Sequence, residues 1–241
     1  MLPLKDNVPT RTFPVVTVAI IAVNVLVFIW EESGGLLQRH IYQWSYYPCE
    51  AHGPCLGPYA PHHHEIVETI FSSMYMHASI VHIGGNMLFL WIFGNNVEDA
   101  LGRIRFLLWY HVGGIVATAA QTFVTIHFGS ASDASVPNLG ASGAIAAVLG
   151  AYFVILPRAS VLTAIFLGFF FFFRDIPAIV FLGIWILFQA LDGTLSLTTP
   201  AAGGGTAFFA HIGGFAFGIL TIKLVQVRPP LQPVARNPWR R

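Results

Sequence analysis

The chain has 241 residues, of which 55% are hydrophobic and only 10% are charged. Soluble domains carry about a quarter charged residues, so this composition excludes an ordinary soluble protein and indicates a polytopic protein of the lipid bilayer. The formal net charge of +1 gives no reason to expect a nucleic-acid partner.

Seven apolar runs follow one another along the chain, at 14–30, 80–93, 106–127, 142–156, 161–173, 177–191 and 206–225. A crossing needs about 20 residues, with about 17 as the usual lower limit. The short run 161–173 therefore predicts a re-entrant or interfacial segment rather than a crossing. The first run is followed by two glutamates and not by a small-residue cleavage site, which favours a retained span over a cleaved signal peptide.

Charge decides between six crossings and seven. With six crossings and a cytoplasmic N-terminus, Arg39 is the only one of the twelve Lys and Arg residues on the outer side, in agreement with the excess of basic residues in cytoplasmic loops. A seventh crossing would move Arg174 outside. We expect both termini in the cytoplasm and the protein in a bacterial inner membrane.

The predicted fold class is an all-α polytopic membrane protein, a bundle of six transmembrane helices in a single domain, 1–241. The expected spans are about 14–30, 80–95, 105–127, 141–157, 177–191 and 206–226. The outer loop 31–79 is rich in aromatic residues and proline, so we expect it to lie partly in the membrane interface. Residues 227–241 form the cytoplasmic tail. No internal repeat is visible, which argues against an inverted-repeat transporter.

Ser142 and His211 form the candidate catalytic pair. In the six-span topology both lie near the outer ends of their helices, at similar depth, although they are distant in sequence. A hydroxyl becomes nucleophilic when a neutral imidazole lies within hydrogen-bond reach, and Gly140 and Gly143 allow the backbone to approach closely. The alternative is that the small residues, including a GxxxG at Gly214, only pack helices together. That alternative leaves His211 unexplained, since ionisable residues inside a membrane are usually functional.

His82 and Asn86 lie at the same predicted depth. They are four residues apart, so they share one helix face, and an imidazole and an amide there would suit an oxyanion hole, with the Ser142 backbone N–H as a further donor. Interhelical hydrogen bonding is the alternative for Asn86. His77 reads as a loop residue that bonds to the helix. No carboxylate is placed to orient His211, so we expect a dyad rather than a triad.

Three motifs together resemble the rhomboid family of intramembrane serine proteases. They are residues 71–90 (FSSMYMHASIVHIGGNMLFL), 140–143 (GASG) and 210–218 (AHIGGFAFG), in this order and on alternating spans. The resemblance covers 14–226. It implies Ser142 as nucleophile, His211 as general base, His82, Asn86 and Gly140 as oxyanion or substrate contacts, a six-helix fold, lateral access of substrate and no cofactor. Glu98 and Gly102 match the family's structural turn after the second helix.

The sequence departs from the family pattern at two places. The family often carries a Trp-Arg pair in the first loop, where this chain reads Ile-Val-Glu-Thr at 66–69, so the anchor of this loop is open. Some members place an aromatic ring one turn after the serine, against the histidine. Here that residue is Ala146, and the base is held differently or rests on another ring such as Phe215.

Cys49 and Cys55 lie together in the first loop, with His62, His63 and His64 nearby. An outer, oxidising compartment favours a disulfide over free thiols. Zinc ligation by cysteine and histidine is a third alternative, and we expect no metal.

These observations predict an intramembrane serine endopeptidase that cleaves single-pass membrane proteins within or near their transmembrane segments. Trp185 or Phe188 on the fifth span are candidates for a lateral gate. The loop 192–205, with the three consecutive glycines 203–205, is a candidate for a lid. One alternative is a catalytically inactive rhomboid-like protein that binds membrane segments. Another is a transporter or channel, but that would need polar groups along the whole depth of the membrane. The substrate and the oligomeric state are open.

Overall fold

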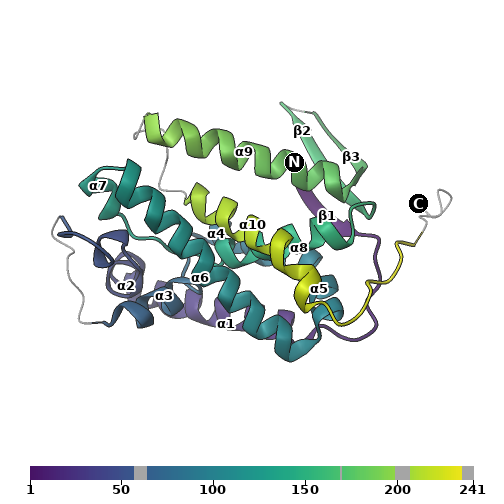
Figure 1. Ribbon diagram of the computed structural model, residues 1–241, viewed down its shortest axis with the longest axis horizontal. Coiled ribbons are helices and arrows are strands. Elements are labelled where there is room, and N and C mark those ends of the chain that lie inside the picture. Colours follow the sequence, from purple (N-terminus) through teal and green to yellow (C-terminus); the bar gives the residue numbers. More distant parts are fainter. Residues whose placement is uncertain (57–63, 169, 199–206, 235–241) are drawn as a thin grey trace.

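The computed structural model describes residues 1–56, 64–168, 170–198 and 207–234. Long helices lie side by side, and a small sheet sits at the end of the molecule that also holds the N-terminal strand and the last described residues, up to Val234, whose N–H donates to the Asn7 carbonyl at 2.9 Å (Figure 1). We call this end the terminal face. The opposite end, built by short helices of the first loop and the turn after α6, is the loop face. The helices are α1 (Val15–Glu32), α2 (Leu37–Trp44), α3 (Ile66–Ser73), α4 (Ile80–Phe89), α5 (Asn95–Leu101), α6 (Arg103–Phe128), α7 (Ala131–Ala134), α8 (Ser142–Ile155), α9 (Ala178–Thr198) and α10 (Phe208–Val225).

The described chain is mostly helical, and a helix stands at each of the six stretches expected to cross a membrane. The second stretch continues from α4 through a π-helical turn, η3 (Leu90–Gly94), into α5. Four of the described helices, α1, α6, α9 and α10, are long and apolar enough to cross a bilayer. This agrees with a polytopic membrane bundle, while the count of six crossings stays a prediction.

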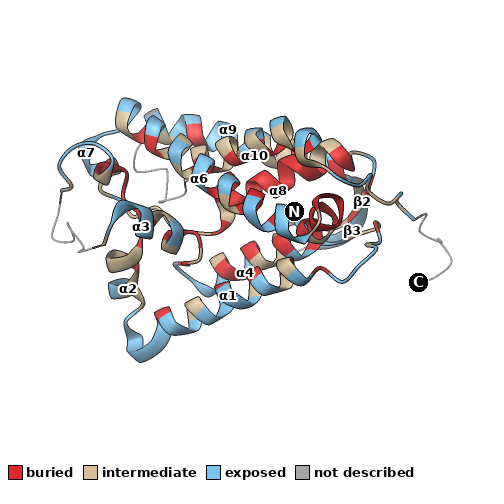
Figure 2. Cartoon of the chain, turned by 60° about the horizontal axis from the view of Figure 1, so that its bottom comes forward, coloured by how far each residue is buried: buried red, intermediate tan, exposed pale blue. Residues whose placement is uncertain are grey.

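Helix α8 lies at the centre of the bundle (Figure 2). Every residue from Gly143 to Tyr152 is buried, because small side chains let α6 and α10 approach it closely. Its 14 residues span about 21 Å at 1.5 Å per residue, less than the hydrocarbon thickness of about 30 Å. At its start, the residues just before Ser142 bond to the first loop, where Asn138 N–H donates to the Tyr46 carbonyl and Gly140 N–H to the Ser73 carbonyl, so Ser142 lies beneath the loop face.

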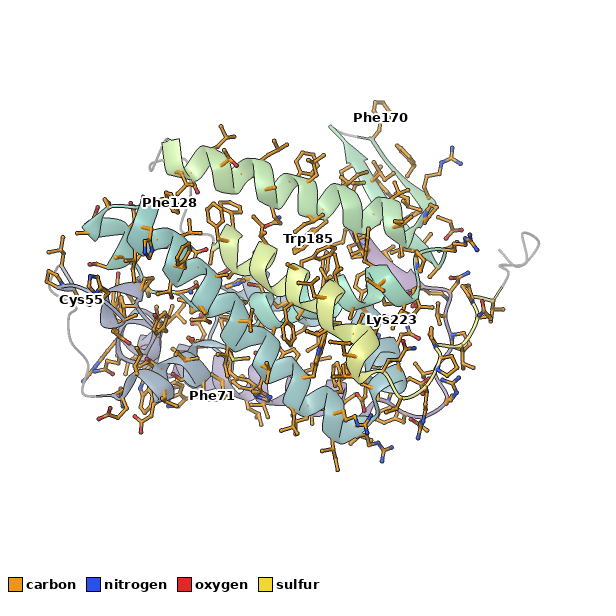
Figure 3. The ribbon with its side chains drawn as sticks, in the orientation of Figure 1. Cys55, Phe71, Phe128, Phe170, Trp185 and Lys223 are labelled. Atoms are coloured by element: carbon orange, nitrogen blue, oxygen red, sulfur yellow. A yellow bond between two sulfur atoms is a disulfide. The ribbon has the colours of Figure 1, made fainter. Side chains whose placement is uncertain are left out.

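The run 161–173 folds as strands, which the sequence analysis did not expect. β2 (Ser160–Leu167) and β3 (Phe170–Pro177) form an antiparallel hairpin, and β1 (Leu2–Asp6) pairs with β2. Alternate residues Val161 and Thr163 are fully buried, the period of two that a strand requires. A hairpin returns to the side from which it started, so this run does not cross. Phe170 at its tip is 80% exposed and points away from the bundle (Figure 3).

The first loop is structured and packs on α6. A disulfide joins Cys49 to Cys55, as expected. Tyr46 is buried; its hydroxyl accepts a hydrogen bond from Thr122 (3.0 Å), and its carbonyl accepts one from the Asn138 backbone (2.7 Å). The buried carboxylate of Glu31, at the end of α1, accepts the His77 N–H. These contacts anchor a loop that lacks the family's Trp-Arg pair.

Two further expectations concern helix ends. Glu98 accepts hydrogen bonds from the backbone N–H groups of Val16 and Thr17 at the start of α1, and Gly102 has a φ of +76° between α5 and α6, so both residues serve the structural turn as expected. The loop expected at 192–205 begins later than predicted, because α9 continues to Thr198. The three glycines of the expected lid lie outside the described residues.

Glu50 in the first loop supports a prediction about pH and stability. Its carboxylate accepts a hydrogen bond from Thr69 (3.0 Å), but burial raises its pKa from 4.5 to about 6. The folded protein thus binds this proton more tightly than the unfolded chain, and the free energy of unfolding falls as pH rises from about 4.5 to about 6. Glu50→Gln should remove this part of the pH dependence, measured as thermal unfolding in detergent at pH 4.5 and pH 7. Glu65→Gln, at an exposed glutamate just before α3, is the matched control. An unchanged pH dependence in Glu50→Gln would contradict the assignment.

Candidate functional site: a serine–imidazole pair beneath the loop face

Ser142 is the first residue of α8, and the backbone before it sets its position. Gly140 has a φ of +123°, which side chains with a Cβ rarely adopt, and its N–H donates to the Ser73 carbonyl oxygen at 2.8 Å. The chain therefore turns sharply into α8 against the end of α3. The first N–H groups of a helix have no partner within the helix, so positive backbone dipole ends surround the Ser142 hydroxyl.

His211 lies on the first turn of α10 and faces Ser142. The distance between His211 Nε2 and Ser142 Oγ is 2.8 Å. The side-chain oxygen of Gln121 on α6 accepts the backbone N–H groups of Phe209 and Ala210 at 3.0 and 3.2 Å, so it fixes the start of α10. The structure thus brings together the two residues expected as a pair, which lie on different helices and 69 residues apart in the sequence.

The second ring nitrogen of His211 contacts a residue that the sequence analysis missed. His211 Nδ1 lies 2.6 Å from Oε1 of Gln189 on α9. An amide oxygen accepts only, so Nδ1 carries the ring proton, and Nε2 is left with a lone pair toward the Ser142 hydroxyl. This is the tautomer in which an imidazole accepts a proton from serine. The signal in the sequence is one amide within the apolar run 177–191.

The ring against His211 is that of Trp185, not of Phe215. The Trp185 and His211 centroids are 5.7 Å apart, and Phe215 in turn lies 6.0 Å from Trp185. Trp185 is only partly exposed and lies on the side of α9 that faces α10 (Figure 3), so it does not simply face lipid. Phe188, the other gate candidate, is 54% exposed. The aromatic support that Ala146 cannot give on α8 comes from α9.

His82 lies over Gly140, next to Ser142. A Cβ added to Gly140 would be 3.0 Å from His82 Nε2 and 3.6 Å from Ser142 Oγ, so the His82 ring and the hydroxyl share one small space. His82 Nδ1 accepts the Ala78 N–H at 3.4 Å, which leaves the ring proton on Nε2, toward that space.

Asn86 has a different partner. Its Nδ2 donates to His77 Nε2 at 2.9 Å, while His77 Nδ1 donates to the Tyr75 carbonyl at 3.2 Å. One amide hydrogen of Asn86 is thereby used to hold His77, and the Gly140 N–H is used by Ser73. His82, Asn86 and Gly140 are the three expected oxyanion or substrate contacts. Of their N–H groups, the His82 ring N–H is the one that shares the space beside the Ser142 hydroxyl. His77 bonds loop to helix, as expected.

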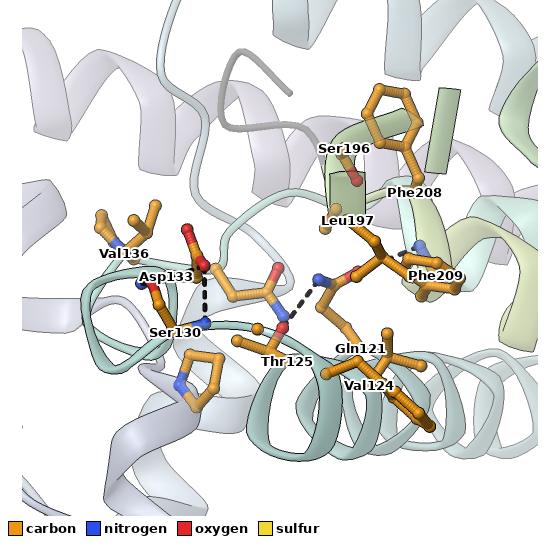
Figure 4. A pocket seen from close by; sticks show the side chains of 16 residues that line it. Gln121, Val124, Thr125, Ser130, Asp133, Val136, Ser196, Leu197, Phe208 and Phe209 are labelled. Carbon is orange, nitrogen blue, oxygen red and sulfur yellow. Dashed lines mark hydrogen bonds between the residues drawn. The ribbon is translucent and has the colours of Figure 1, made fainter. Parts of the chain in front are cut away.

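Two cavities lead toward Ser142 from the loop face. A small one of about 20 Å³ touches Ser142 and Gly143, enough for one water molecule. A larger one of about 440 Å³ lies among the ends of α6, α9 and α10 (Figure 4). Its polar side chains include Gln121, Thr125, Ser130 and Asp133. Asn138 and Ala207 line both cavities, so the larger cavity adjoins the smaller one at these two residues. Among the described residues, no three His, Cys, Asp or Glu side chains are grouped to hold a metal ion.

The fold and the site define this protein as a polytopic helical membrane protein with a candidate serine–histidine pair beneath one face. Comparison with known protein families identifies the family: residues 64–227 match the Rhomboid domain. The chain belongs to the rhomboid family.

The chain is also similar to several proteins that carry the name of this family. It is 34% identical over 150 residues to presenilin-associated rhomboid-like protein A, mitochondrial, of Danio rerio, covering 61% of the chain and 34% of that protein. It is 30% identical over 159 residues to Rhomboid protein 1, mitochondrial, of Saccharomyces cerevisiae, covering 63% and 40%. For the human presenilin-associated rhomboid-like protein, mitochondrial, the identity is 30% over 203 residues, covering 83% and 45%. The chain thus spans less than half the length of each of these relatives.

These relatives correct the expected location. All three are mitochondrial proteins by name, so the expectation of a bacterial inner membrane, with cytoplasmic termini and a site opening to the extracytoplasmic side, is wrong. That expectation rested on the distribution of basic residues, which orders the loops relative to one another but does not identify the membrane.

Proposed function

We propose that this protein is an intramembrane serine endopeptidase that cleaves transmembrane protein substrates within or near their membrane segments. The observation that carries the proposal is the 2.8 Å contact between His211 Nε2 and Ser142 Oγ, with the other ring nitrogen engaged by Gln189. Membership of the rhomboid family supports a protease-like activity, and the mitochondrial relatives support a mitochondrial membrane as its setting.

Peptide hydrolysis by this pair follows from the proton positions. Ser142 Oγ bonds to the scissile carbonyl carbon while its proton passes to His211 Nε2. The tetrahedral intermediate then collapses, the C–N bond breaks, and His211 returns the proton to the leaving amine. Water from the adjoining cavity attacks the remaining Ser142 ester, with His211 again as base, and frees the serine.

The oxyanion of the intermediate needs donors that are in place before the reaction. His82 Nε2–H and the backbone N–H groups at the start of α8 supply them in this proposal. Asn86 acts on the same site by holding His77, just before α4, through its side-chain amide. Gly140 contributes the close approach of the backbone to His82 rather than a donor.

Substrate access follows from the same geometry. A peptide bond in a spanning helix is shielded by its own hydrogen bonds, so a substrate must unwind locally to reach Ser142. In this proposal the substrate enters laterally past α9, on the side of that helix where Phe188 is exposed. Helix-destabilising residues near the substrate's scissile bond should therefore increase the cleavage rate.

A fluorophosphonate probe tests the proposal, because it reacts only with an activated serine. The purified protein in detergent should be labelled, and Ser142→Ala should not. Ser33→Ala, which removes an exposed hydroxyl bonded to the Trp30 carbonyl at 2.6 Å, is the matched control and should be labelled like the unaltered protein. An unlabelled protein that also leaves a panel of single-pass proteins intact would be the inactive membrane-segment binder instead.

A further inference from the structure

The strongest contact of the His211 ring outside the Ser142 pair is made by Gln189. The Nδ1–Oε1 distance of 2.6 Å is shorter than the 2.8 Å between His211 and Ser142. Gln189 lies one helical turn after Trp185 on α9, so the two side chains share one face, and both touch the same imidazole. The ring is thus held at its Nδ1 edge by an amide and on its side by an indole.

The orientation of this amide decides what His211 can do. With Oε1 toward the ring, Nδ1 is protonated and Nε2 is free to take the serine proton. With the amide NH₂ toward the ring, Nδ1 would have to be the acceptor, and the ring proton would sit on Nε2, pointing at the Ser142 hydroxyl. That tautomer cannot act as a base toward Ser142. A neutral amide can therefore do the orienting work that a carboxylate does in a serine–histidine–aspartate triad.

In the part of the chain that the structure describes, no charged side chain around the ring accounts for this arrangement. The titratable groups that face His211 there are the Ser142 hydroxyl on α8 and the imidazole of His82 on α4. Helix α9 presents the neutral Gln189 and Trp185. From α6, the neutral Gln121 bonds the neighbouring backbone of α10. Among the described residues, Gln189 is the only side chain bonded to His211 Nδ1.

We propose that Gln189 is a positioning residue of this site: through its Oε1 it fixes the His211 tautomer and ring orientation that Ser142 requires. The proposal rests on the proposed function for its catalytic meaning, but the tautomer can be observed without turnover. It also makes the competence of the base depend on the spacing of two helices, because Gln189 belongs to α9 and His211 to α10.

Imidazole nitrogen NMR on the unaltered protein tests the tautomer directly. With ¹⁵N-labelled histidine, the His211 signals are assigned by their absence in His211→Gln. The proposal expects a protonated Nδ1 and an unprotonated Nε2 at neutral pH. The reverse pattern would overturn it, whether or not the protein is active.

Two substitutions test the catalytic consequence. Gln189→Met keeps the length of the side chain and removes the acceptor, and the rate of fluorophosphonate labelling at Ser142 should fall about 10- to 100-fold, as for other groups that orient a reactive side chain. Gln189→Glu keeps an acceptor and adds a charge that stabilises imidazolium. It should retain labelling near pH 8 while the acidic limb of the pH–rate profile moves to higher pH by about one unit or more.

A purely structural role would give a different result. Both Gln189 variants would then be slowed together, in proportion to their loss of thermal stability, and the acidic limb would not move. Gln226→Met, at a half-buried glutamine bonded to Arg228 near the terminal face, is the matched control and should label at the original rate. If the unaltered protein is not labelled at all, the proposed function fails while the NMR result still decides the role of Gln189. Normal labelling of Gln189→Met would reject the positioning role alone.

Discussion

His211→Ala should reduce the reactivity of Ser142 by about 10⁴- to 10⁶-fold, as removal of the base does in other serine hydrolases. Without the imidazole at 2.8 Å, the Ser142 hydroxyl has to lose its proton to water. The measurement is the rate of fluorophosphonate labelling in detergent, followed by cleavage of a single-pass substrate in proteoliposomes. The effect exceeds that of any support group, because it removes the proton acceptor itself.

The pair should also behave as a unit. The double variant Ser142→Ala/His211→Ala should be no slower in substrate cleavage than either single variant, since residues that act together are strongly non-additive. His127→Ala, an exposed histidine whose ring bonds the Phe123 carbonyl in its own helix, is the matched control and should keep full activity. A fully active His211→Ala with normal expression would refute the assignment of the base.

Ser142 and His211 can be paired from the sequence because topology alone places them. Helices that run in the same direction put their starting residues at the same face, so Ser142 and His211 could be placed near each other without any knowledge of contacts. His82 could be placed by the same argument, and the structure brings it to Gly140. The number of crossings and their alternating directions are properties of the whole chain, and they do not depend on the exact residue at which each helix ends.

What the sequence analysis missed depends on side-chain partners. Asn86 lies on the predicted face, but its amide bonds His77, a choice that no spacing rule contains. Gln189 bonds His211 from another helix, and a neutral amide in an apolar run carries no charge that would predict this pairing. The strands β2 and β3 were missed because a run of thirteen apolar residues has the same hydropathy in a strand and in a short helix. The backbone pairing decides between them: β2 pairs with β3, and also with β1, more than 150 residues away.

Gly218→Ala should destabilise the fold by about 3 kcal/mol or more, because the seam between α8 and α10 has no room for a methyl group. A Cβ at Gly218 would overlap the Ala147 carbonyl oxygen and lie 2.8 Å from the Ala151 nitrogen. Both obstacles are backbone atoms, which cannot turn aside as a side chain can, so the helices would have to separate.

Gly214→Ala applies the same test one turn closer to the site. Its Cβ would overlap the Gly143 carbonyl oxygen and lie 3.2 Å from the Ala146 Cβ, so α10 must move away from the start of α8. Because hydrogen bonds weaken steeply with distance, the His211–Ser142 contact should be lost along with the stability. Thermal unfolding in detergent measures the first effect and fluorophosphonate labelling the second.

Gly183→Ala on α9 is the matched control. It distinguishes the effect of steric crowding from the effect of replacing any helical glycine by alanine. No atom lies within 4 Å of a Cβ built there, so the substitution should be neutral or should stabilise the helix by up to about 1 kcal/mol. If Gly218→Ala and Gly183→Ala unfold at the same temperature, the close seam does not exist in the protein. The contact between His211 and Ser142 depends on this seam. Helix α10 brings His211 to 2.8 Å from Ser142 because its glycines let its backbone touch that of α8.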